Sequence, residues 1–114
     1  MQEKKEIWKK IWHNEKYEAD YWSGKIRNSN TQHILNQRKK KSKYYYVKLT
    51  CKYRKTREYL VHRLVAIAHI RPHNPKKQVG HNNKNRGQDG AWNLSWQTVK
   101  QNIKHRDNYQ YKNY

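Results

Sequence analysis

The stretch VHRLVAIAHIRPHNPKKQVGHNNKNRGQDGAWNLSWQTVKQN, residues 61–102, decides the fold expected for this chain. Its first nine residues carry apolar side chains at i, i+3, i+4 and i+7, the spacing of one helix face: Val61, Leu64, Val65 and Ala68. The pattern predicts a core helix that Pro72 and Pro75 end. His62 and His69 lie off the apolar face, where a histidine is more often a surface or hydrogen-bonded group than a metal ligand.

The rest of the stretch predicts two strands and a helix. KKQVGHNN reads as a strand ending near His81, and a loop rich in Asn, Gly and Arg follows it. Alternating large apolar residues then predict a second strand with an aromatic inner face: Trp92, Leu94 and Trp96. Thr98 can cap a final helix whose inner stripe comprises Val99, Asn102, Ile103 and Arg106. That stripe would turn Asn102 toward His81.

This order of elements suits metal-assisted cleavage of a phosphodiester. A neutral histidine can take a proton from water, while a divalent cation on oxygen ligands stabilises the charge that develops on the leaving oxygen. A tight hairpin backed by a helix can bring both parts together within a short length of chain.

The chain resembles the HNH endonucleases, specifically their phage and intron-homing branch. The matching positions appear in the family's order: HRLVA, His81, Asn93-Leu94, Trp96, Thr98 and Asn102. Upstream, WKKIW, YEADYWSGKIRN and YYYVKL are similar to the β-rich module that often precedes the nuclease motif. Together the two resemblances cover about residues 8–105.

The expected architecture is α+β, with a small N-terminal antiparallel β module followed by a His-Asn-Asn ββα-metal motif. Residues 1–60 would form an N-terminal helix and the β-rich module, 61–106 the core helix and the HNH-like motif, and 107–114 a basic and aromatic tail, all in one compact unit. The N-terminal helix is predicted from apolar groups at i, i+1, i+4 and i+5: Ile7, Trp8, Ile11 and Trp12. Strands are expected at 25–27 and 43–53, with 57–60 pairing back as a hairpin.

The resemblance implies a role for individual residues. His81 would be the general base, Asn93 would hold the loop and orient the site, and Asn102 would bind a single Mg²⁺ or another divalent cation. The family usually has Asp or Asn immediately before the base, but this chain has Gly80. Glycine offers no side-chain oxygen, so either Asp89 and the substrate phosphate hold the ion or the site is catalytically weak.

The charge of the chain predicts a nucleic-acid partner, and the resemblance to the homing endonucleases favours DNA over RNA. There are 27 Lys and Arg against 8 Asp and Glu, a formal charge of +19, and residues 1–20 hold five of each sign, so the surplus lies beyond them. Such a surplus attracts phosphates through counterion release. The residues expected to contact phosphates are Arg38, Lys39, Lys40, Lys41, Arg63, Lys84, Arg86, Lys100 and Lys104.

Two other readings of the chain are open at this point. A non-catalytic binder that kept the fold, attached to structured RNA or a ribosome-like assembly, would explain Gly80 and the charge. A basic membrane-surface protein would need a strongly amphipathic basic helix, which the sequence lacks. The single Cys51 gives no thiolate cluster, so no structural zinc is expected. Without a long apolar run or a secretory signal, the chain is expected to be soluble and intracellular, and its oligomeric state stays open.

Overall fold

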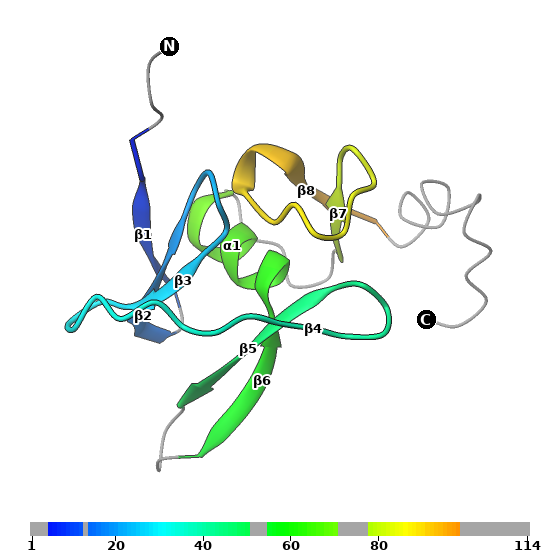
Figure 1. Cartoon of the computed structure of the whole chain (residues 1–114). Helices are drawn as coiled ribbons and strands as arrows, with labels where there is room; N and C mark the ends of the chain where they lie inside the picture. The colour runs from blue at the N-terminus through cyan, green and yellow to red at the C-terminus, as the bar shows by residue number, and fades with distance from the viewer. Residues whose placement is uncertain (1–4, 13, 51–54, 71–77, 99–114) are drawn as a thin grey trace.

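The computed structural model describes residues 5–12, 14–50, 55–70 and 78–98 of the chain. Within these ranges three small antiparallel sheets surround one helix (Figure 1). The first sheet contains β1 (Trp8–Ile11), β2 (Asn14–Asp20) and β3 (Ile26–Asn28). The second contains β4 (Arg38–Lys39), β5 (Tyr45–Thr50) and β6 (Thr56–Leu60), and the third contains β7 (Gln78–His81) and β8 (Leu94–Gln97). The helix α1 spans Val61–His69, and a short 3₁₀ helix, η2 (Ala91–Asn93), precedes β8. The α+β prediction is confirmed.

The predicted N-terminal helix is wrong, because this segment is the strand β1. It pairs antiparallel with β2, with Trp8 opposite Asp20. Ile11 is fully buried, but Trp12 is 59% exposed, so the apolar groups do not share one face. The Arg27 guanidinium covers the Trp8 ring at 3.9 Å from its centroid. A short isolated helix is costly to nucleate, and bulky Ile and Trp side chains fit a sheet well, so pairing with β2 prevails.

The hairpin predicted from the strand at 43–53 and the segment at 57–60 is present as β5 and β6. Val47 pairs with Tyr59, and Leu49 pairs with Arg57. Val47 and Leu49 are buried while Lys48 between them is exposed, which is the period-two alternation that the sequence predicted. The predicted strand at 25–27 is also present, shifted by one residue to β3.

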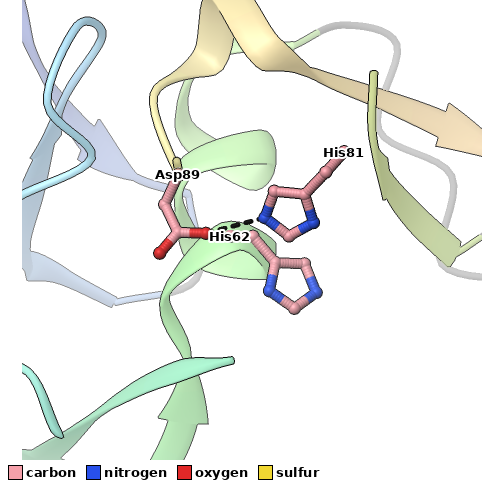
Figure 2. Close-up of side chains that lie close together, drawn as sticks. All are labelled: His62, His81 and Asp89. Atoms are coloured by element: carbon pink, nitrogen blue, oxygen red, sulfur yellow. Dashed lines mark hydrogen bonds and ion pairs between the residues drawn. The ribbon is translucent and has the colours of Figure 1, made fainter. Parts of the chain in front are cut away.

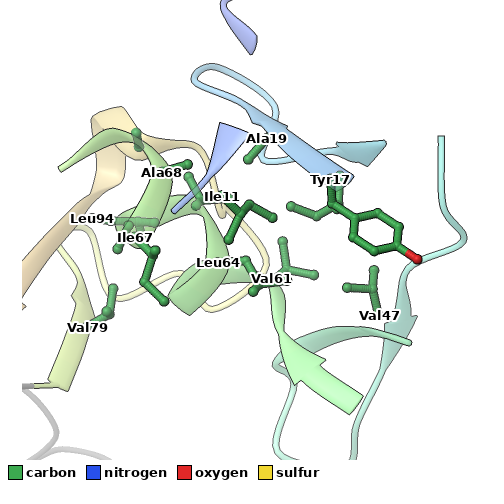
Figure 3. Close-up of a cluster of buried hydrophobic side chains, with 14 of the residues drawn as sticks. Ile11, Tyr17, Ala19, Val47, Val61, Leu64, Ile67, Ala68, Val79 and Leu94 are labelled. Atoms are coloured by element: carbon green, nitrogen blue, oxygen red, sulfur yellow. The ribbon is translucent and has the colours of Figure 1, made fainter. Parts of the chain in front are cut away.

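The predicted core helix is confirmed as α1, and it contacts strands of all three sheets. Figure 3 shows its apolar side chains meeting residues from the sheets on either side. The buried core residues that the sheets contribute are Ile11, Tyr17, Ala19, Ile26, Val47, Leu49, Val79 and Leu94. Each large aliphatic side chain buried there contributes about 1.5–3 kcal/mol relative to exposure, so this one helix organises the core.

The third sheet is the hairpin that was expected to carry the site. His81 pairs with Leu94 and Gly80 pairs with Ser95. The prediction that Trp92 faces inward on the second strand is wrong: Trp92 lies in η2, is 45% exposed, and donates from Nε1 to the Trp22 carbonyl at 3.0 Å. The backbone turns through η2 before extended structure begins at Leu94, so the alternation starts two residues later than the sequence suggested.

Several predictions lie outside the described residues. These are the ends of the core helix at Pro72 and Pro75, the final helix with Asn102, Lys100 and Lys104, and the tail 107–114. In the described ranges no helix combines the length and the apolar character needed to cross a membrane.

Candidate active site

Three buried polar side chains meet where the hairpin packs against α1. His81 stands at the end of β7, Asp89 in the loop after it and His62 in the first turn of α1 (Figure 2). His81 Nε2 lies 2.8 Å from Asp89 Oδ1, and one ligand atom from each of the three residues lies within 4.8 Å of the others. Their exposed fractions are only 6%, 7% and 3% for His62, His81 and Asp89. Burial of three such groups together is costly unless they satisfy one another.

The contact between His81 Nε2 and Asp89 Oδ1 is a hydrogen bond only in certain protonation states of the pair. An ionised carboxylate only accepts, so with Asp89 ionised the contact corresponds to the tautomer of His81 that carries its proton on Nε2. The Nδ1 atom then keeps a lone pair. A histidine held in this way has one nitrogen anchored and the other free to take a proton.

His62 is buried, which corrects the expectation of a surface or satisfied histidine. Its Nδ1 atom has no hydrogen-bond partner among the described residues, and its ring centroid lies 4.9 Å from that of His81. Burial, with the nearby His81 and Arg63, lowers the pKa of His62 to about 3. His62 is therefore neutral at physiological pH.

His62 is buried, contrary to expectation, because of the position of α1 among the three sheets. A helix covered on several sides buries residues outside its apolar stripe, so periodicity alone misplaces His62. The helix's other histidine is satisfied as expected, because His69 Nε2 lies 2.7 Å from the Ala19 carbonyl.

Asn93 ties together the loop that carries Asp89. It is 1% exposed, and its Nδ2 donates to Asn83 Oδ1 and to the Gln88 carbonyl, each at 2.9 Å. Its Oδ1 accepts from the Asn83 backbone N–H at 3.1 Å. These bonds span the loop from its beginning to the residue before Asp89. The structure thus places Asn93 where a loop-holding side chain is needed.

The turn at residues 20–24 of the first sheet braces the same loop. The Ala91 N–H donates to the Tyr21 carbonyl at 2.7 Å. Gly24 has φ +74° and approaches so closely that an added Cβ would lie 2.7 Å from the Asp89 carbonyl carbon. A Cβ at Gly90 would collide with the Trp22 carbonyl. Only glycine fits both contacts, so the position of Asp89 depends on this turn.

Asp20 holds that turn in shape. Its carboxylate accepts from the backbone N–H groups of Ile7 at 2.8 Å and Ser23 at 2.9 Å, and from Ser23 Oγ at 2.7 Å. Burial acts to raise the pKa of Asp20, but the hydrogen bonds from Ser23, Ile7 and Trp22 outweigh it and lower the pKa from 3.8. The carboxylate is therefore ionised and fully engaged at neutral pH.

Gly80 leaves a space that another side chain fills. The Gln97 amide packs where a side chain at position 80 would begin, and a Cβ there would collide with it. Gln97 is 7% exposed, and its Oε1 has no hydrogen-bond partner among the described residues. Because successive residues of a strand point to opposite faces, this amide oxygen and the His81 ring lie on opposite faces of β7. No pattern in the sequence indicates this contact between Gln97 and Gly80.

Most of the predicted phosphate-contacting residues are accessible. Among those in the described ranges, the exposed ones are Arg38, Lys39, Lys40, Lys41 and Lys84. Lys40 Nζ lies 3.1 Å from Glu58 Oε1.

The two arginines of this set are half-buried against rings. The Arg63 guanidinium lies 5.9 Å from the centroid of Trp96, and that of Arg86 lies 5.1 Å from Tyr44. Arg86 thereby stands beside the site, since the Tyr44 ring stacks on His81 with centroids 5.8 Å apart.

Comparison with known proteins gives two relatives, while no family model matches the chain. An uncharacterised HNH endonuclease, L247, of Acanthamoeba polyphaga mimivirus is 35% identical over 109 residues, which is 92% of this chain and 27% of that protein. The solved structure of the HNH homing endonuclease I-HmuI, described for its DNA binding and cleavage, matches with a TM-score of 0.76 and 26% identity over 95% of this chain and 62% of that one. The chain thus spans about a quarter of the viral relative.

Proposed function

Because this chain is homologous to the HNH endonucleases, we propose that it is a metal-dependent endonuclease that binds DNA and nicks or cuts it. The observation that carries the proposal is the buried pair of His81 and Asp89 at the end of the hairpin, with Nε2 and Oδ1 2.8 Å apart. A histidine held by a carboxylate beside a loop is suited to take a proton from water.

In the proposed reaction His81 is the general base. Asp89 accepts from Nε2–H and so leaves Nδ1 to take a proton from the attacking water. Asn93 keeps the loop, and with it Asp89, in place through its bonds to Asn83 and Gln88. Asp89 acts on the reaction through the orientation of His81, which makes it a positioning residue.

The cation implied by the family is Mg²⁺ or another divalent ion, and the Gln97 oxygen beside Gly80 fits it. Mg²⁺ prefers oxygen ligands, and Gln97 Oε1 is a buried oxygen without a hydrogen-bond partner among the described residues. We assign this oxygen, with Asn102, as the protein ligands of a single ion. Asp89 Oδ1 is already engaged by His81, which favours its positioning role over the ligand role considered from the sequence. When bound, the ion supplies positive charge to the leaving oxygen.

The proposed DNA contact is made mainly to phosphates. Arg38 and Lys39 are exposed in β4, Lys41 is exposed in the turn that follows it, and Lys84 is exposed in the hairpin loop. Contacts of this kind fix position without reading sequence, so we expect strong salt dependence and little sequence preference.

The experiment is cleavage of supercoiled plasmid by the full chain with Mg²⁺. Wild type should convert the plasmid to nicked or linear product, and His81→Ala should do so about 10²–10⁴ times more slowly. The matched control is His33→Ala, which removes an exposed histidine away from the site. Equal cleavage by wild type and His81→Ala would remove His81 from the mechanism.

A non-catalytic nucleic-acid binder is the second candidate, and Gly80 favours it. Gln97 fills the space of a side chain at this position and offers only a neutral oxygen. This candidate predicts an intact plasmid at enzyme excess, together with tight, salt-sensitive binding to structured RNA. Comparable weak affinity for all nucleic acids would count against it.

A further inference from the structure

We propose that His62, His81 and Asp89 form a second metal site, selective for a borderline transition metal such as Zn²⁺ or Co²⁺, and that its occupation switches off the base. The three ligand atoms come from α1, β7 and the hairpin loop and already lie within 4.8 Å of one another. The inhibitory consequence rests on the proposed role of His81, whereas the binding itself does not.

The donor set decides which ions fit. Two imidazole nitrogens and one carboxylate oxygen are the ligands of many three-residue zinc sites, which leave a further position open. Mg²⁺ instead demands six oxygen ligands in near-ideal octahedral geometry. The site is therefore distinct from the Gln97 oxygen beside Gly80, which lies on the opposite face of β7.

The state of His62 is the second observation. Its side chain is more than nine-tenths buried, yet Nδ1 has no hydrogen-bond partner among the described residues. A buried polar atom left in this state costs about 1–3 kcal/mol. Figure 2 shows the His62 ring beside the hydrogen-bonded pair of His81 and Asp89. An ion held between the three side chains would engage His62 once rotation of the side chains brings the ligand atoms, which lie within 4.8 Å of one another, to bonding distance of the ion.

Occupation of this site would change His81 in a defined way. The ion takes the Nε2 lone pair, so the proton that Nε2 carried moves to Nδ1. Asp89 exchanges its hydrogen bond from His81 for a bond to the ion. With Nδ1 protonated, His81 has no lone pair to take a proton from water, and cleavage stops while DNA binding persists.

The test is titration of the full chain with Co²⁺ without DNA, followed by visible absorption. We expect one tight equivalent with the spectrum of a nitrogen- and oxygen-ligated ion. His62→Gln and Asp89→Asn should each lose it, while His33→Ala, which removes an exposed histidine, should keep it. Identical Co²⁺ binding by wild type and His62→Gln would overturn the site.

Two further measurements keep the proposal testable if a variant misfolds. In NMR spectra of the histidine rings, Zn²⁺ should shift the ring nitrogens of His62 and His81 and leave those of His69 and His33 unchanged. Shifts confined to other histidines would overturn the site. Addition of Zn²⁺ to a cleavage reaction with excess Mg²⁺ should abolish nicking at one equivalent and leave DNA affinity unchanged. If the Zn²⁺-bound protein nicks DNA at an unchanged rate, the proposed inhibition is wrong. If wild type never cuts DNA, the proposed nuclease function is wrong, but the metal site is not affected.

Discussion

His81 and Asp89, eight positions apart in the chain, form a buried hydrogen bond of 2.8 Å between Nε2 and Oδ1. The loop between them is closed by Asn93 and braced by the turn at 20–24. Because Asp89 Oδ1 contacts His81, Asp89 could orient the base or hold the cation, and the two roles predict different effects of substitution.

Asp89→Asn should lower the rate of plasmid nicking at saturating Mg²⁺ by at least about tenfold, because an amide can present the wrong hydrogen-bonding group to His81 Nε2. The Mg²⁺ concentration that gives half the maximal rate should stay the same. The measurement is the nicking rate as a function of Mg²⁺ concentration. A variant whose maximal rate is restored at high Mg²⁺ would make Asp89 a ligand of the ion instead.

Gly80→Asp should raise the affinity for Mg²⁺, because a carboxylate replaces a neutral oxygen at the cation site. The new side chain must displace the Gln97 amide, which is the end of a flexible side chain, so Gly80→Asp combined with Gln97→Ala should gain more than the single variant. Binding of Mn²⁺ without DNA, followed by electron paramagnetic resonance, measures this directly. Equal Mn²⁺ affinity in wild type and both variants would place the cation elsewhere.

Asp20→Asn should destabilise the fold by about 1–3 kcal/mol at pH 7, since a buried carboxylate that accepts three hydrogen bonds is replaced by an amide with one acceptor oxygen. The pKa of folded Asp20 lies below the ordinary 3.8, so its ionised form stabilises the protein above pH 3.8 and this contribution is lost as the pH falls through the folded value. Urea unfolding across pH 2–7 should therefore show the difference between wild type and variant shrinking below about pH 4.

The exposed pair of Glu58 and Lys40 supplies the control for Asp20. Glu58→Gln should change stability little at any pH, because an exposed ion pair is well screened. If Asp20→Asn unfolds no more easily than Glu58→Gln, the hydrogen bonds to Ile7 and Ser23 are not what holds the turn.

Replacement of Arg38, Lys39 and Lys41 by Ala should weaken DNA binding and reduce its dependence on salt. Each lost phosphate contact lowers the slope of log affinity against log salt by about 0.9. Fluorescence anisotropy with a short duplex over a series of KCl concentrations measures the slope. Lys10→Ala and Lys16→Ala, exposed residues of the charge-balanced first 20 positions, are the matched control and should leave it unchanged.

Sequence patterns predicted the elements whose periodicity reflects a single environment. α1 and the β5–β6 hairpin each have one apolar face against the core, so the spacing of their apolar residues located them. The segment at residues 7–12 was predicted wrongly, because its apolar residues do not share one environment: Ile11 is buried and Trp12 is exposed. The spacing of residues within this segment also does not reveal its pairing with β2. Long-range pairing overrides local periodicity there.

The candidate site was predictable only in part for a similar reason. The motif identifies His81 and Asn93. Asp89 is a candidate because it is the carboxylate in the loop between the two predicted strands. No local pattern, however, shows that α1 is covered on the side of His62, or that Gln97 fills the space at Gly80. Both facts depend on how the hairpin packs against the helix, which periodicity does not encode.

The contact between the turn at 20–24 and Asp89 has a consequence for how sequence change affects this protein. A genetic screen for altered cleavage should return substitutions at Asp20 and Gly24, although neither residue belongs to the proposed catalytic or DNA-binding set. Such variants would lower the rate of cleavage, although the substituted residues lie in the first quarter of the chain. Substitutions in the turn at 20–24 and in the hairpin loop are therefore expected to occur together in related sequences. A chimaera that takes its β module from a relative should also need the hairpin loop of that relative.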